Sequence, residues 1–130
     1  MFKKQASKAV IFHTDFFFLQ LRDNKKTILY PNKWCFFGGG VKSGETPLSA
    51  LKRELIEELS FSTSNLIFEF EFFNYDSHTN IFFYSVRLNS MKKFLVNEGQ
   101  KGEWIKKNNL KKLNLAPDTL HYKENILNLK

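Results

Sequence analysis

The chain alternates between strand-like and helix-like patterns of hydrophobic and polar residues. Residues 6–13 (ASKAVIFH) and 16–22 (FFFLQLR) are rich in β-branched and aromatic side chains, and Asp15 interrupts them. Such runs predict two strands joined by a short turn. A third strand is predicted over residues 34–37, after the polar loop that ends with residues 31–33. Together these segments predict the first part of a sheet.

The second half of the chain shows a similar alternation. In residues 66–75 (LIFEFEFFNY) phenylalanines alternate with Glu69 and Glu71, which predicts a half-buried strand whose glutamates face solvent. Residues 80–88 predict the next strand, after a turn. We therefore expect an antiparallel pair in this half of the chain.

Two segments carry the spacing of a helix. Thr46 can cap the first helix and Pro47 suits its first position, and the pattern continues to about Leu59. A terminal helix is predicted over residues 119–129, with Leu120 among its packing residues. Strands flanked by two helices indicate an α+β sandwich. The leucines of the first helix fall within an arc of about 80° and form a core-facing stripe: they are Leu48, Leu51, Leu55 and Leu59.

The same helix has an acidic face beside its leucine stripe. Glu54, Glu57 and Glu58 occupy an arc of about 100°, because spacings of three and four residues bring side chains together. Three like charges repel one another unless a cation takes up their oxygens, and Mg²⁺ favours carboxylate ligands. Arg53 borders this face, and Glu45 approaches from the preceding loop. The pattern indicates a metal site, with a solvated acidic face as the simpler alternative.

The spacing of these residues resembles the Nudix box, the signature motif of the Nudix hydrolases. The matching positions are Gly39, Glu45, Arg53, Glu54, Leu55, Glu57, Glu58 and Phe61. The family usually has glycine where this chain has Ser60. That glycine ends the helix in a left-handed turn, so serine should cost about 1 kcal/mol without touching the chemistry. The resemblance covers essentially the whole chain. It implies the Nudix-type α/β/α sandwich, with a mixed sheet and the strand-loop-helix that carries the box.

The resemblance also implies a reaction, the hydrolysis of a nucleoside diphosphate linked to another group. It implies that Glu54, Glu57 and Glu58 bind Mg²⁺, for which Mn²⁺ can substitute. Glu54 is the expected general base and Arg53 orients it, while Glu57 is a further catalytic residue. Glu45 is expected to support the loop before the helix.

Three glycines precede the box. Gly38, Gly39 and Gly40 are expected to bend the backbone tightly and to expose its amide and carbonyl groups. The resemblance implies that a carbonyl of Gly38 or Gly39 binds metal and that this turn contacts substrate. Most MutT-like relatives have proline where this chain has Phe37, a variant that leaves the substrate open. Lys33, in the loop just before, is expected to lie near the substrate.

Two later segments resemble MutT-like pyrophosphohydrolases. Residues 98–104 read EGQKGEW. In that branch the first glutamate adds a carboxylate to the metal site, which implies this role for Glu98. A polar residue after a late proline reads the edge of the base there, and Asp118, or Thr119 in a shifted register, occupies that position. A surface charge at Glu98 and helix capping by Asp118 are the structural alternatives.

Length and composition limit the class of protein. A chain of 130 residues is expected to form one domain over residues 1–130. It contains no apolar run near the roughly 20 residues that a membrane helix needs, and its basic start makes a poor signal peptide. The single cysteine, Cys35, fits a reducing compartment. We expect a soluble cytoplasmic protein that does not enter a membrane.

The net charge of +7 is concentrated in the last third of the chain. Residues 91–130 contain nine Lys or Arg against four Asp or Glu, whereas residues 1–90 contain eleven against nine. A basic surface favours anionic partners such as nucleotides and RNA. A general compositional bias toward lysine explains the same excess, so nucleic-acid binding is the less favoured interpretation.

Three functions are compatible with these patterns. The EGQKGEW segment favours a pyrophosphohydrolase of nucleoside or deoxynucleoside triphosphates, oxidised ones included, which releases monophosphate and pyrophosphate. The variant before the glycines also allows a hydrolase of nucleotide sugars or dinucleotide-type substrates. A non-catalytic nucleotide-binding or RNA-binding module is the third alternative. The complete glutamate set argues against this module, because binding alone does not need it.

Overall fold

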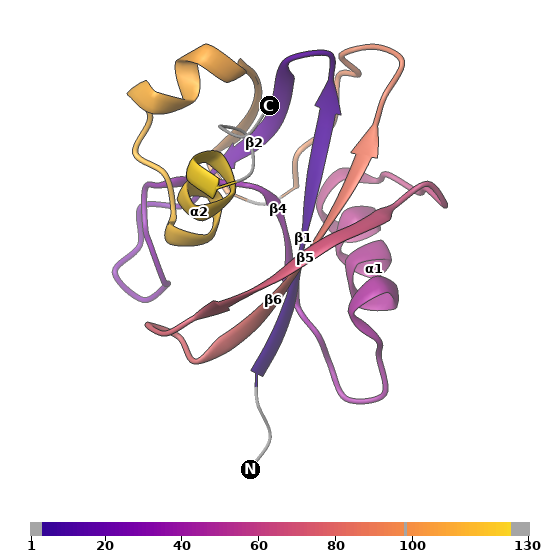
Figure 1. Ribbon diagram of the computed structural model, residues 1–130, viewed down its shortest axis with the longest axis vertical. Helices are drawn as coiled ribbons and strands as arrows, with labels where there is room; N and C mark the ends of the chain where they lie inside the picture. Colours follow the sequence, from indigo (N-terminus) through magenta and orange to yellow (C-terminus); the bar gives the residue numbers. More distant parts are fainter. Residues whose placement is uncertain (1–3, 98, 126–130) are drawn as a thin grey trace.

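Strand β1 (Lys4–His13) runs through the middle of the sheet, and the other elements are arranged around it (Figure 1). The computed structural model describes residues 4–97 and 99–125. The other elements are, in chain order, β2 (Phe16–Leu21), β3 (Trp34–Cys35), β4 (Phe37–Gly40), α1 (Pro47–Leu59), β5 (Ile67–Asn74), β6 (Thr79–Arg87), β7 (Lys101–Lys106), the 3₁₀ helix η1 (Lys107–Lys112) and α2 (Pro117–Asn125).

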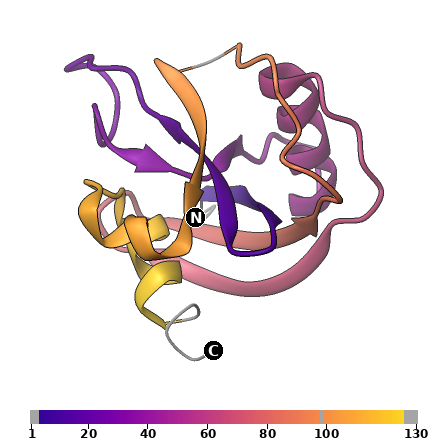
Figure 2. The same cartoon turned by 90° about the horizontal axis from the view of Figure 1, so that it is seen from above.

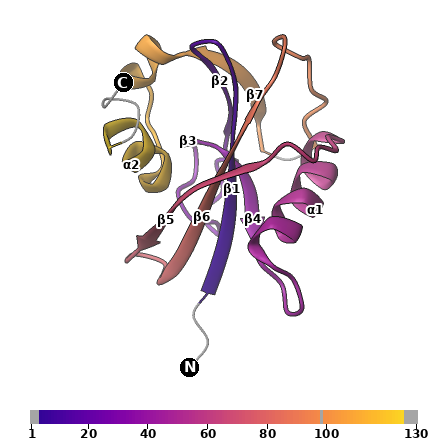
Figure 3. The ribbon, with the colours of Figure 1, turned by 45° about the vertical axis from the view of Figure 1, so that its right-hand side comes forward.

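The sheet is mixed, with the strand order β3-β2-β1-β6-β5. β1 runs antiparallel to β2 and parallel to β6, while β5 and β6 form an antiparallel pair. β4 lies along the first half of β1, where Gly38 is opposite Lys8, and β7 pairs with β2. Figure 3 shows the sheet between α1 on one side and α2 on the other. The predicted α+β sandwich with a mixed sheet is confirmed.

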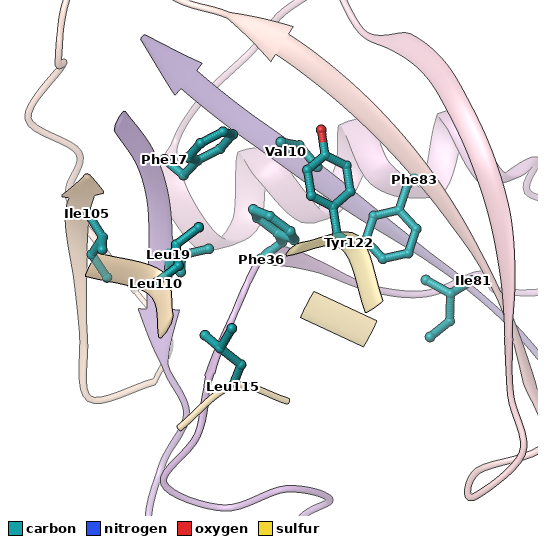
Figure 4. Packing of buried hydrophobic residues seen from close by; sticks show 10 residues of the cluster. All are labelled: Val10, Phe17, Leu19, Phe36, Ile81, Phe83, Ile105, Leu110, Leu115 and Tyr122. Atoms are coloured by element: carbon teal, nitrogen blue, oxygen red, sulfur yellow. The ribbon is translucent and has the colours of Figure 1, made fainter. Parts of the chain in front are cut away.

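Two hydrophobic cores lie on opposite faces of β1, and Figure 2 shows a helix against each face. On one face Ala9 packs in a cluster with Leu51 of α1. On the other face Val10 packs in a cluster with Tyr122 of α2 (Figure 4). Successive side chains of a strand point to opposite faces. Lys8 therefore lies on the same face as Val10, the one that α2 covers.

Both predicted hairpins are confirmed, since β1 pairs with β2 and β5 pairs with β6. Glu69 and Glu71 on β5 are exposed, as the alternation predicts. A register shift between Phe68 and Phe70 interrupts the regular pairing of β5 with β6. The extra residue in β5 changes which side chains face the core on either side of this bulge.

The predicted strand over residues 34–37 is wrong in one respect, because β3 and β4 are separated at Phe36. Here the backbone bonds to side chains instead of a neighbouring strand. The Phe36 N–H donates to Thr119 Oγ1 (3.2 Å), and its carbonyl accepts from Lys8 Nζ (3.2 Å). The glycines at 38–40 do not bend tightly as predicted but continue as β4 against β1.

Helix α2 begins at Pro117, two residues before its predicted start. Asp118 is therefore inside the first turn and is not the N-cap. The prediction that Leu120 packs is wrong, because 39% of it is exposed while Tyr122 is buried. The remaining predicted packing residues of this helix, at 126–129, lie outside the described residues. No helix within the described ranges is long and apolar enough to cross a membrane.

Helix α1 has the boundaries that its end signals predict. Thr46 Oγ1 accepts a hydrogen bond from the Ser49 amide (3.1 Å), and Ser49 Oγ accepts one from the Thr46 amide (2.9 Å), which forms a capping box. At the other end Ser60 adopts the left-handed conformation, with φ 53° and ψ 35°. The buried leucines of the stripe are Leu51, Leu55 and Leu59.

Replacing Ser60 with glycine should stabilise the fold by about 1 kcal/mol, because glycine adopts a positive φ without strain at Cβ. The free energy of unfolding in urea, followed by circular dichroism, measures this gain. Ser62→Gly is a matched control, since Ser62 is exposed and has no positive φ. Equal stability of Ser60→Gly and the control would contradict the expectation.

Candidate active site

An open cleft of about 390 Å³ lies beside β4 on the face of the sheet that α2 covers. Its walls bring together the glycines of β4, the acidic helix α1, the loop between β2 and β3, and the start of α2. The polar and glycine residues that line it include Lys8, Arg22, Tyr30, Gly38, Gly39, Gly40, Glu54, Asn74 and Asp118.

Arg53 is the centre of the acidic group. Its guanidinium donates to both carboxylate oxygens of Glu45, at 2.7 and 3.0 Å, in a bidentate pair. It also donates to Glu54 (2.9 Å), to Glu57 (3.2 Å) and to the carbonyl of Gly40 (3.1 Å). One cation thereby joins three carboxylates of the box to the end of the glycine strand.

This network keeps the carboxylate of Glu45, in the loop before α1, ionised. The hydrogen bonds from Arg53, and then the one from the Lys42 amide, lower the pKa of Glu45 to about 2. The bond to Glu45 raises the pKa of the Arg53 guanidinium in turn, and Glu54 adds to this effect. Because both groups remain ionised at neutral pH, Glu45 anchors Arg53 and leaves its other N–H groups directed at Glu54 and Glu57.

The carboxylates differ in exposure. The Glu58 residue is buried, and its Oε1 accepts a hydrogen bond from the Gly38 amide (3.2 Å). The Glu54 side chain is 14% exposed and lines the cleft, whereas the Glu57 side chain is 55% exposed. The acidic face of α1 therefore extends from the protein interior to solvent along one helix.

The absence of a side chain at Gly39 lets Glu54 approach the backbone. A Cβ at Gly39 would lie 2.6 Å from the Glu54 carboxylate. The carboxylate thus occupies the space that a side chain at this position would fill. Only glycine allows the carboxylate of α1 to come this close to the backbone of β4.

The acidic face of α1 and the backbone of β4 carry the types of donor that suit a hard divalent cation. Glu54, Glu57 and Glu58 supply carboxylate oxygens and β4 supplies backbone carbonyls, which are the ligand types that Mg²⁺ prefers. Within residues 4–97 and 99–125, no three His, Cys, Asp or Glu side chains are grouped closely enough to hold a metal ion. Arg53 instead neutralises part of the acidic group.

A second polar group lines the cleft around the start of α2. Asp118 Oδ1 accepts hydrogen bonds from the Thr119 amide (2.6 Å) and from Thr119 Oγ1 (3.2 Å). Nearby, the Tyr30 hydroxyl accepts a hydrogen bond from Asn74 Nδ2 (3.0 Å), which ties the loop between β2 and β3 to the end of β5. These contacts hold the walls of the cleft together across long stretches of sequence.

Lys8 is a buried cation between these two groups. Burial alone lowers its pKa, but the electrostatic influence of Cys35, Asp118 and Glu58 outweighs burial and raises the pKa overall. Its ammonium donates to the carbonyl of Phe36. These neighbouring groups therefore offset the effect of burial on the Lys8 ammonium.

The structure places fewer than half of the predicted site residues in the lining of this cleft. Gly38, Gly39, Gly40, Glu54 and Asp118 line it. Thr119 is buried and does not line the cleft. The other predicted residues that the lining does not include are Lys33, Glu45, Arg53, Glu57 and Glu58. Glu98 lies outside the described residues.

Sequence reasoning missed the other lining residues, of which the polar ones are Lys8, Arg22, Tyr30, Asn74, Ser77 and Thr79. A signal existed only for Lys8, which is a charge directly before the apolar residues 9–12 of β1. Tyr30 lies in a polar loop, and Asn74 lies at the end of a strand where asparagine is common, so neither differs from an ordinary turn residue in sequence.

Comparison with known proteins identifies the family and the fold of this chain. The profile of the NUDIX domain matches residues 3–126. One solved chain comes from a study of MutT from Aliivibrio salmonicida and Vibrio cholerae. Its sequence is 22% identical to this chain, the TM-score is 0.80, and the match covers 98% of both chains. The MutT NUDIX hydrolase from Burkholderia pseudomallei is 20% identical, with a TM-score of 0.83, over 97% of this chain and 99% of that one.

A curated relative matches a shorter segment. The RNA pyrophosphohydrolase of Sulfurovum sp. (strain NBC37-1) is 46% identical over 46 residues, which is 35% of this chain and 29% of the relative. The match therefore spans less than a third of that protein's length. The domain match, in contrast, extends over almost the whole chain. The chain belongs to the NUDIX domain family and has the MutT-like fold of a Nudix hydrolase.

Proposed function

We propose that this protein hydrolyses nucleoside triphosphates, oxidised or deoxy forms included, to a nucleoside monophosphate and pyrophosphate. The observation that carries the proposal is the acidic group of α1, which Arg53 joins to the glycine strand at the edge of a nucleotide-sized cleft. Nudix hydrolases act on nucleoside diphosphates linked to another group and generally use a divalent metal ion, usually Mg²⁺.

In this proposal Glu54, Glu57, Glu58 and the carbonyl of Gly39 hold Mg²⁺, with Mn²⁺ as a substitute and Glu98 as a further ligand. The ion, when bound, neutralises phosphate charge and lowers the pKa of a water molecule. The closeness of Glu54 to the Gly39 backbone supports this ligand set, because it brings a carboxylate beside a carbonyl-bearing strand.

The protein's own groups have distinct parts in the reaction. Glu54 accepts the proton of the attacking water as general base. Arg53 donates to Glu54 at 2.9 Å and orients its carboxylate. Glu45 holds Arg53 in place through a bidentate pair. Gly38 and Gly40 form the backbone surface that the phosphates contact.

We place the base of the nucleotide near Asp118, at the start of α2. This residue is only 6% exposed and yet lines the cleft, which supports a role in contacting the ligand. The proposal takes residues 1–130 as one domain, and the use of β1 by both hydrophobic cores supports this.

A second candidate substrate is RNA with a 5′-triphosphate. The 46-residue match to an RNA pyrophosphohydrolase favours it, and so does the lysine-rich last third of the chain, since basic surfaces attract the phosphate backbone. Its reaction uses the same acidic group and releases the same pyrophosphate.

A panel of substrates with Mg²⁺ tests these proposals. The panel contains the four NTPs and dNTPs, 8-oxo-dGTP, nucleotide sugars and a 5′-triphosphate RNA oligonucleotide, with a chelator as control. We expect pyrophosphate and monophosphate from at least one triphosphate, and none with the chelator. Turnover of nucleotide sugars alone would replace the proposal with that alternative, and nucleotide binding without any turnover would indicate a non-catalytic module.

A further inference from the structure

The last turn of α1 carries Glu57 and Glu58, two of the proposed metal ligands. Just beyond them, the amides of Ser60 and Phe61 donate to the carbonyls of residues 56 and 55, at 2.9 and 3.1 Å. These two bonds end the helix, so the carbonyls of Glu57 and Glu58 have no partner within α1, all of which the structure describes. Both carbonyls therefore need donors from another part of the chain.

Asn97 supplies both of these donors. Its backbone N–H donates to the Glu58 carbonyl (2.8 Å), and its side-chain Nδ2 donates to the Glu57 carbonyl (3.1 Å). Asn97 is exposed and lies 40 residues after Glu57, so neither bond belongs to the helix itself. One residue thus pairs both carbonyls and closes the end of α1.

The segment before Asn97 is fixed by aromatic packing. The described residues 91–97 form neither helix nor strand. The ring centroid of Phe94 lies 4.9 Å from that of Phe18 on β2 and 5.2 Å from that of Phe61, which follows α1. All three rings pack in the hydrophobic cluster that α1 shares with the sheet. The core therefore holds this segment against the end of α1, where Asn97 makes its two bonds.

Negative charge accumulates at this end of α1. The carbonyls of a helix end are partially negative, the last turn of α1 has no basic residue, and Glu57 and Glu58 add two carboxylates. A lysine in the place of Asn97 would also donate to the carbonyls, but its charge would compete with a divalent cation for the carboxylates. The neutral amide of Asn97 pairs the carbonyls without adding such a charge.

We infer that Asn97 is a positioning residue for the proposed metal site. By bonding to the backbone of Glu57 and Glu58, it fixes the last turn of α1 and sets the direction in which their carboxylates meet the cation. Mg²⁺ demands nearly ideal placement of its ligands, so a helix end that frays loses affinity for it. The inference rests on the proposed function and adds a residue that touches neither the cation nor the substrate.

Binding of Mn²⁺ to the substrate-free protein tests the inference without any turnover. Electron paramagnetic resonance measures the free Mn²⁺ in a titration. Asn97→Ala removes the side-chain donor and is expected to weaken Mn²⁺ binding about tenfold. Asn97→Gln keeps an amide donor at this exposed position and should stay within about threefold of wild type. Asn108→Ala, at an exposed position of η1, is the control and should bind like wild type.

Amide hydrogen exchange in the metal-free protein reports on the helix end directly. In Asn97→Ala the amides of Ser60 and Phe61 should exchange about fivefold faster, as expected for the loss of one hydrogen bond that holds this turn. The amide of Leu51, in the buried middle of α1, should exchange as in wild type. Thermal melting checks that each variant is folded. A cap with a purely structural role would change the exchange and leave Mn²⁺ binding unchanged.

Turnover separates metal binding from substrate binding. With the best substrate of the panel, Asn97→Ala should need about tenfold more Mg²⁺ for half-maximal activity, while its KM at saturating Mg²⁺ stays within about twofold. Unchanged Mn²⁺ affinity in folded Asn97→Ala, or an equal loss in Asn97→Gln, would overturn the inference. The proposed function fails separately: no hydrolysis of triphosphates by the wild type would refute it, whereas the Mn²⁺ and exchange measurements need no substrate and still decide the role of Asn97.

Discussion

The Glu57→Gln variant is expected to lose nearly all turnover, with kcat lower by about 1000-fold, while its fold stays intact. Glu57 is 55% exposed at its side chain and makes one charged contact, to Arg53 at 3.2 Å. Its loss therefore costs little stability. In the proposed site, however, a neutral amide no longer provides the charge that a divalent cation requires. Pyrophosphate release at saturating Mg²⁺ measures the effect.

Glu71→Gln is the matched control for this experiment. Glu71 is also an exposed glutamate with one side-chain contact, from Asn80 at 3.1 Å, but it lies on β5 and does not line the cleft. Its activity should stay within about twofold of wild type, as is usual for surface substitutions. Glu58→Gln should resemble Glu57→Gln in activity. Near wild-type rates in Glu57→Gln would contradict a role of the acidic group of α1 in the reaction.

Gly38→Ala is expected to destabilise the fold by about 3 kcal/mol or more, which corresponds to a melting temperature lower by roughly 10 °C. Gly38 has φ 150°, a region that other residues rarely adopt, and an added Cβ would lie 1.9 Å from the carbonyl oxygen of Ser7. The opposing atom belongs to the backbone of β1, so it cannot move aside without breaking the sheet. Thermal melting and the yield of soluble protein report the loss.

Gly40→Ala tests whether this effect is specific to the position. A Cβ at Gly40 would meet nothing within 4 Å, and Gly40 has no positive φ. Its melting temperature should remain within a few degrees of wild type. If both variants were equally stable, the close approach of β4 to β1 at Gly38 would be refuted.

The predictions for Glu57 and Gly38 concern two parts of one structural arrangement. The acidic face of α1 supplies the carboxylates. The glycines of β4 let the backbone of β4 lie close both to these carboxylates and to β1. Arg53 links the two by bonding to Glu54 and to the Gly40 carbonyl, 2.9 and 3.1 Å away. A change in β4 is therefore expected to disturb the carboxylates even though no carboxylate is altered.

Local signals along the chain were sufficient to predict helix α1 and the grouping of its glutamates on one face. The cap at Thr46, the leucine stripe and the left-handed end at Ser60 all follow from interactions within four residues of each other. The spacing of Glu54, Glu57 and Glu58 follows from the same helical period. These features are independent of what the rest of the chain does, so reading the sequence predicts them together with the family resemblance.

Other features required the register of the strands. The bend predicted at the glycines is absent, because pairing with β1 extends them as β4. The break at Phe36 arises because Lys8 and Thr119, 28 residues before it and 83 residues after it, take its backbone hydrogen bonds. No local pattern specifies such partners, since they depend on which strands meet and how they are aligned.

By itself, the sequence determined that this protein has a capped amphipathic helix whose glutamates share one face. It also determined that a run of glycines precedes this helix and that the chain is of the α+β class. The periods of helix and strand are local, and they set these features before any tertiary contact forms. The tertiary structure alone decided that Lys8 is buried beside Asp118 and that Tyr30 meets Asn74 across the cleft. Those contacts join residues far apart in the chain, and only the packing of β1, β4 and α2 brings them together.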